Sequence, residues 1–62
     1  MTTPVSKFIG EGRHKLLIGE HPDKAYIASY VDDTIRGGFY TVDDLLEIEA
    51  TVRCIRRRIQ GR

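Results

Sequence analysis

The sequence predicts an α+β protein, with a small antiparallel sheet of three to four short strands packed by one C-terminal helix. We expect a single small domain, 1–62. Two observations lead to this prediction. Short runs rich in β-branched and aromatic residues alternate with turn-forming segments as far as residue 40. A long amphipathic pattern follows them, and an apolar sheet face and an apolar helix stripe are stable when they cover each other.

The strands expected in the first half of the chain are separated by short polar turns. A run at 5–9 leads into Gly10-Glu11-Gly12-Arg13, which is typical of a hairpin connection, and then into Leu16-Leu17-Ile18. The next turn is Glu20-His21-Pro22-Asp23, whose residue types favour a reversal of the chain. This pattern predicts consecutive antiparallel strands.

Residues 24–40 allow two interpretations. As strands, 25–31 and 34–40 flank a tight turn at Asp32-Asp33. As a helix, the segment has a rigid first position at Pro22 and a stop at Gly37-Gly38. We favour strands because they continue the antiparallel pattern. The alternative fold is an N-terminal β-hairpin followed by two antiparallel helices.

The C-terminal segment predicts a helix from about Val42 to Gln60. Thr41 and Asp44 have the spacing of a capping box, and Gly61 ends the pattern. Apolar residues recur every three or four positions, which places them in one stripe along the helix. The stripe consists of Leu45, Ile48, Val52, Ile55 and Ile59. We expect it to pack on the inner face of the sheet.

The charges are sorted along the chain although the net charge is only +1. Between residues 20 and 49 there are eight acidic residues and two basic ones, whereas the last ten residues carry five arginines and no acid. Charge sorted in this way steers binding partners more than it determines a fold. The sequence therefore favours binding through a charged surface over catalysis.

Antiparallel hairpins would gather part of the acidic residues at one end of the sheet. The turn at 20–23 and the start of the helix share this end, and the Asp32-Asp33 turn lies at the other. The candidate partner-binding residues are Glu20, Asp23, Asp32, Asp33, Asp43, Asp44 and Glu47. Such an acidic surface suits a protein partner with a basic surface. The ordinary explanation is that aspartate is common in turns and at helix starts.

Two other candidate surfaces lie on the helix. Arginine suits phosphate in geometry and charge, so a nucleic-acid-binding surface is the alternative function. Its candidate residues are Arg53, Arg56, Arg57, Arg58 and Arg62. A narrower apolar line beside the main stripe, formed by Leu46, Ala50 and Cys54, is a candidate homodimer seam. The protein is thus expected to be a monomer or a homodimer.

Several classes of function have no support in the sequence. One cysteine and two histidines cannot assemble a usual four-ligand zinc site, so we expect no metal and no cofactor. No nucleophile–base signature is present, and we expect no enzymatic activity. The apolar run Leu16-Leu17-Ile18 is too short to cross a membrane, and the lone thiol fits a cytoplasmic protein.

In size and in its anionic cluster (Glu20, Asp23, Asp32, Asp33, Asp43 and Asp44) the chain resembles the small inhibitors that bacterial viruses encode against nucleic-acid-handling defences, including anti-CRISPR proteins. The resemblance covers no diagnostic motif. It implies a viral, cytoplasmic inhibitor whose acids act as phosphate surrogates and block a basic DNA- or RNA-binding site. Another alternative is an assembly subunit of a larger particle.

Overall fold

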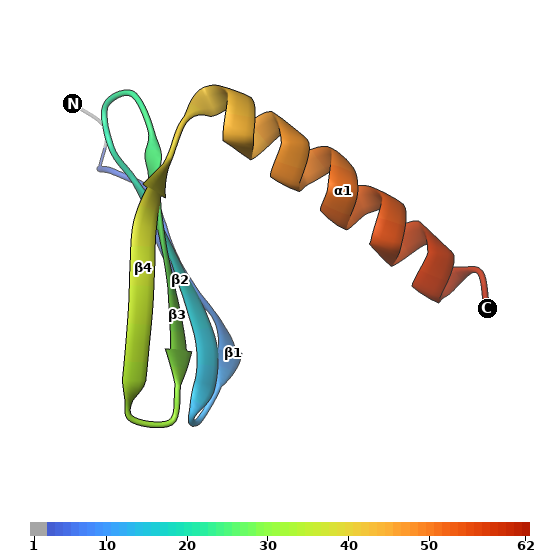
Figure 1. Cartoon of the computed structure of the whole chain (residues 1–62), viewed down its shortest axis with the longest axis horizontal. Helices are drawn as coiled ribbons and strands as arrows, with labels where there is room; N and C mark the ends of the chain where they lie inside the picture. Colours follow the sequence, from blue (N-terminus) through green and yellow to red (C-terminus); the bar gives the residue numbers. More distant parts are fainter. Residues whose placement is uncertain (1–2) are drawn as a thin grey trace.

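A computed structural model describes residues 3–62 and shows a four-stranded antiparallel sheet followed by one helix (Figure 1). The elements are β1 (Ser6–Glu11), β2 (His14–Glu20), β3 (Ala25–Val31), β4 (Thr34–Tyr40) and α1 (Val42–Gln60). The α+β class is confirmed, and residues 24–40 form strands. The alternative with two antiparallel helices is wrong.

The sheet is a simple meander in which each strand pairs with the next, in the order β1-β2-β3-β4. Two-residue turns join β1 to β2 and β3 to β4. Both turns contain a residue in the left-handed region, Gly12 with φ 64° and Asp32 with φ 53°. Tight hairpin turns require this conformation, and glycine and aspartate tolerate it better than most residues. The turn chemistry at Asp32 therefore explains why 24–40 does not continue as a helix.

The register sorts the side chains of the sheet onto two faces, because alternate residues of a strand point to opposite sides. Ile9, Leu16 and Ser29 are aligned across β1, β2 and β3 and share one face, which we call the groove face. Leu17, Ala28 and Gly37 are aligned across β2, β3 and β4 on the opposite face. We call that the aromatic face, because it carries Phe8, Tyr26, Tyr30 and Phe39.

Helix α1 begins directly after β4, with Thr41 as its N-cap. The Thr41 side chain accepts a hydrogen bond from the Asp44 amide, and the Asp44 carboxylate accepts one from the Thr41 amide. The predicted capping box is therefore present. Figure 1 shows that the helix then diverges from the sheet toward its C-terminal end.

The contact between α1 and the sheet is narrower than the sequence predicts. The helix meets β4 near their junction, and none of its residues is buried. Beyond this junction an open groove of about 710 Å³ separates the helix from the groove face. The groove is lined by Ile9, Leu16, Ile18, Ile27, Tyr40, Ile48, Glu49, Val52, Arg53 and Arg56. The apolar stripe thus faces the sheet across the groove and does not seal it.

The buried core of the described chain is small. Its buried apolar residues are Ala25 and Ala28, and Ala28 is completely inaccessible to solvent. The ring of Tyr26 lies over Gly37 on the aromatic face, beside Ala28. Large apolar residues such as Phe8, Ile35 and Val52 remain more than half exposed.

Candidate functional site

The sheet register brings two acidic segments to the same end of the molecule. Ala25 pairs with both Glu20 and Tyr40, so the turn after β2 lies beside the end of β4, from which α1 begins. Leu45 of α1 shares a small pocket with Glu20 and Lys24, which shows that the helix start lies against this turn. We call this region the acidic end. It contains Glu20, Asp23, Asp43, Asp44 and Glu47.

Two carboxylates of the acidic end are held in place by backbone amides. The Glu20 Oε1 atom accepts a 2.8 Å hydrogen bond from the amide of Val5, which ties the turn end of β2 to the residue preceding β1. The Asp44 Oδ2 atom accepts a 3.3 Å bond from the Thr41 amide within the cap. These contacts give both residues a structural role, and they restrict the positions of their charges.

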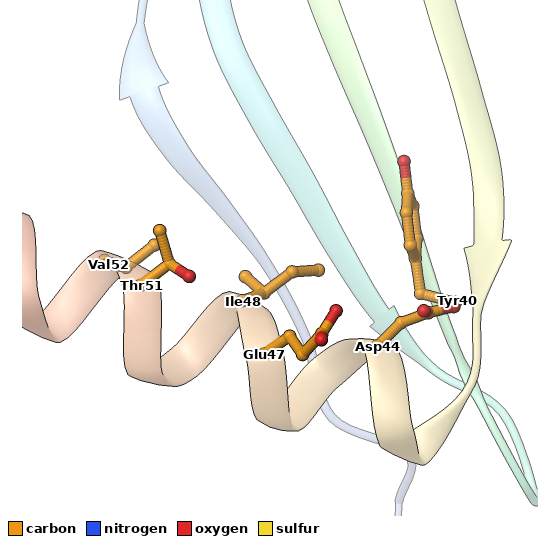
Figure 2. A pocket seen from close by; sticks show the side chains of 6 residues that line it. All are labelled: Tyr40, Asp44, Glu47, Ile48, Thr51 and Val52. Atoms are coloured by element: carbon orange, nitrogen blue, oxygen red, sulfur yellow. The ribbon is translucent and has the colours of Figure 1, made fainter.

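A shallow hollow of about 410 Å³ lies between the first turns of α1 and the end of β4. Figure 2 shows Asp44 and Glu47 on successive turns of the helix, with the Tyr40 ring beside them and Ile48 and Val52 further along. The hollow therefore combines two carboxylates, a phenol and an apolar floor. Groups of this kind suit the basic and apolar side chains of a protein partner.

The remaining two acidic candidates lie apart from the acidic end. Asp32 and Asp33 form the turn between β3 and β4, at the opposite end of the sheet. The Asp32 amide donates a 2.7 Å hydrogen bond to the Arg13 carbonyl, which links this turn to the neighbouring hairpin. The separation agrees with the predicted arrangement of the turns.

Three of the four arginines of α1, Arg53, Arg56 and Arg57, have the i, i+3, i+4 spacing of neighbours on one side of a helix. Arg53 makes a 3.0 Å ion pair with Glu49, and Arg56 donates a 2.9 Å hydrogen bond to the Gln60 side chain. Arg53 and Arg56 line the groove. Arg57 and Arg58 occupy the last turn of the helix, and their side chains leave it about 100° apart. Arg62 follows the helix.

The apolar line of Leu46, Ala50 and Cys54 is exposed and lies away from the groove. At about 100° per residue, its centre is about 180° around the helix from the stripe. The line is therefore on the opposite side of α1 from the stripe, not beside it. Cys54 is a free, exposed thiol on this outer side.

The aromatic face brings together four aromatic rings from β1, β3 and β4. Phe8 meets Tyr30 edge to face, with ring centroids 5.7 Å apart, and Tyr26 lies 5.3 Å from Phe39. The Lys15 ammonium lies 5.1 Å from the centre of the Phe8 ring. Lys24 lies 5.3 Å from the centre of the Phe39 ring. The strand register is the signal that brings these residues together, and it also puts Tyr40 on the other face.

The structure has no evident metal site or membrane span between residues 3 and 62. No group of three or more His, Cys, Asp or Glu side chains in this range is placed to hold a metal ion. Over the same range, no helix is both long and apolar enough to cross a membrane.

No family model, curated protein or solved structure matches the chain.

Proposed function

We propose that this protein is a non-catalytic binding protein whose acidic end occupies a basic, nucleic-acid-binding surface on a protein partner. The observation that carries the proposal is the convergence of two acidic segments, the turn after β2 and the first turns of α1, at one end of the sheet. A partner thereby loses access to its nucleic acid, as expected of an inhibitor or regulator.

The acidic end has two properties that suit this role. Its carboxylates come from two different elements, so their charges are spread over a surface, as the phosphates of a nucleic acid are. The backbone bonds of Glu20 and Asp44 restrict two of these charges before any partner arrives. Charges fixed in advance lose less conformational entropy on binding, and a surface whose net charge is negative speeds encounter with a positively charged surface.

Charge reversal at two exposed residues tests the proposal. Asp23 and Glu47 belong to different segments of the acidic end, and neither has one of the hydrogen bonds that hold Glu20 and Asp44. The double variant Asp23→Lys/Glu47→Lys should therefore fold normally and lose at least tenfold in partner affinity, or about 1.4 kcal/mol. Retention of the partner on immobilised protein, measured over a series of salt concentrations, reports this loss.

Asp33→Lys is the matched control, because it changes an exposed acid in the turn at the opposite end of the sheet. It should retain the partner nearly as well as the wild-type protein does. Equal retention by the folded double variant and the wild-type protein would rule out the acidic end as the binding surface.

The aromatic face favours a second candidate function, the binding of single-stranded nucleic acid. Bases stack on aromatic rings exposed on a sheet, and nearby lysines attract the backbone. Phe8 and Phe39 are each about half exposed and lie beside Lys15 and Lys24. In this case Lys15→Glu and Lys24→Glu should weaken binding of a labelled single-stranded oligonucleotide, measured by fluorescence anisotropy at low salt. Unchanged anisotropy on addition of the wild-type protein would exclude this function.

A further inference from the structure

A single chain exposes more surface than a compact folded monomer of the same mass. A compact monomer of 7.1 kDa is expected to expose roughly 4,100 Å². This chain exposes 5677 Å². Its Cα radius of gyration is 13.4 Å. A compact chain of this length would have a radius of about 11 Å. The excess surface is roughly 1,600 Å² per chain, which lies within the range that each subunit of an obligate homodimer buries.

Many of the large apolar residues that a single chain leaves exposed lie beside the groove between α1 and the sheet, or continue its apolar stripe along the helix. Ile9 on the sheet and Val52 on the helix face it, and each is more than half exposed. Ile55 and Ile59 continue the same stripe beyond the groove lining, where the helix has diverged from its own sheet (Figure 1). The C-terminal half of α1 therefore carries part of an apolar stripe that its own sheet does not cover.

We propose that a second copy of this chain fills the groove. In a two-fold symmetric pair, the stripe of each α1 enters the groove of the other subunit, so one contact covers both grooves and both distal stripes. A two-fold interface requires a surface that is complementary to itself. The stripe meets this requirement. In each subunit it forms one wall of the groove, and its apolar side chains can also pack into the apolar groove of the other subunit.

The charges around the groove are compatible with a second copy. Glu49, Arg53 and Arg56 give its rim charges of both signs. The net charge of the chain is +1, so two copies repel each other only weakly. The sheet wall of the groove is mainly isoleucine and leucine, which bind an apolar helix and not a nucleic acid.

The mass of the purified protein in solution tests the dimer, with two helix variants as a matched pair. Val52 and Leu46 are 56% and 59% exposed in a single chain, but Val52 lines the groove and Leu46 lies on the outer side of α1. Sedimentation equilibrium of the wild-type protein should give twice 7.1 kDa, with dissociation on dilution. Leu46→Glu should keep this mass. Val52→Glu should weaken association at least a hundredfold or unfold the chain.

Each outcome of this experiment decides the proposal. If Val52→Glu unfolds and Leu46→Glu does not, the proposal is supported, because a single chain buries these two side chains to nearly the same extent. A wild-type protein that stays monomeric at high concentration overturns it, as does a Val52→Glu protein that dimerises like the wild type. Rapid, complete disulfide crosslinking through Cys54 under a mild oxidant also overturns it, because Cys54 lies on the outer side with Leu46. Partner binding is not needed for any of these measurements, so the proposed function can fail independently.

Discussion

At the scale of single residues, Gly37 and Gly38 are neighbours in β4 with opposite requirements. A Cβ atom added at Gly37 would approach the Tyr26 hydroxyl and would lie 2.7 Å from Tyr26 Cζ and 3.0 Å from Ala28 Cβ. A Cβ atom at Gly38 would meet nothing within 4 Å. Gly37 therefore makes room for the Tyr26 ring, which helps to cover the small core on the aromatic face.

We predict that Gly37→Ala lowers the free energy of unfolding by about 1–2 kcal/mol, because the added methyl group displaces the Tyr26 ring. Gly38→Ala, on the other side of the same strand, should be neutral or stabilising by up to about 1 kcal/mol, since alanine loses less conformational entropy in a strand. Denaturant unfolding of both variants at one protein concentration measures the difference. A Gly37→Ala protein as stable as Gly38→Ala would contradict the packing described for Tyr26.

The residue scale also shows where sequence reasoning succeeds. The Asp32-Asp33 turn, the Thr41 cap and the Gly61 stop could all be predicted, because each depends on residues adjacent in the chain. The two faces of the sheet could not be assigned in the same way. The pairing of Phe8 with Tyr30 depends on the strand register, and a shift of one residue reverses every side chain of a strand.

At the scale of elements, α1 depends on local interactions more than most helices do. None of its residues is buried in a single chain, so packing contributes little to its stability there. In most proteins the packing of an amphipathic face supplies most of a helix's stability, and this helix of nineteen residues has little of that packing. The capping box at Thr41 and Asp44 and the exposed Glu49–Arg53 pair are therefore important to it.

We predict that Thr41→Ala costs about 1 kcal/mol of stability and reduces the helical content, because the Asp44 amide loses its acceptor. Thr41→Ser keeps a side-chain oxygen at this position and should behave like the wild-type protein. Circular dichroism during thermal unfolding measures both effects. If Thr41→Ala retains full helicity and the wild-type midpoint, the cap is not a determinant of the helix.

The limits of α1 and its apolar stripe could be predicted from the sequence, whereas its distance from the sheet could not. Periodicity identifies a face that avoids water, but it does not identify the surface that covers this face. The stripe of Ile48 and Val52 faces the sheet across an open groove. The place of Leu46, Ala50 and Cys54 on the outer side of the helix, by contrast, follows from the helical period alone.

At the scale of the whole molecule, the fold separates two kinds of surface. The meander places the acidic end at the junction between the sheet and α1, whereas the groove lies between the sheet and the following turns of the helix. The acids of the acidic end do not line the groove, so a dimer through the groove leaves them exposed, although Tyr40, Ile48 and Val52 line both the groove and the hollow beside Asp44 and Glu47. Two copies of the acidic end on one dimer would also raise the avidity for a partner with two basic sites.

The acidic end itself could be anticipated from the sequence only after the strands were assigned. Glu20 and Asp43 are far apart in the chain, and they lie at the same end because two successive antiparallel pairings, β2 with β3 and β3 with β4, return the end of β4 to the level of Glu20. The identity of the partner depends on a surface that this chain does not contain, and no pattern within 62 residues encodes it.

The most direct measurement is a displacement titration with the partner captured by the wild-type protein. The partner is first loaded with fluorescently labelled nucleic acid, and the protein is then added at increasing ratios. We predict release of the nucleic acid at near-stoichiometric amounts of wild-type and Asp33→Lys protein, with little release by Asp23→Lys/Glu47→Lys. A stable complex that contains the partner, the protein and the nucleic acid together would contradict the account.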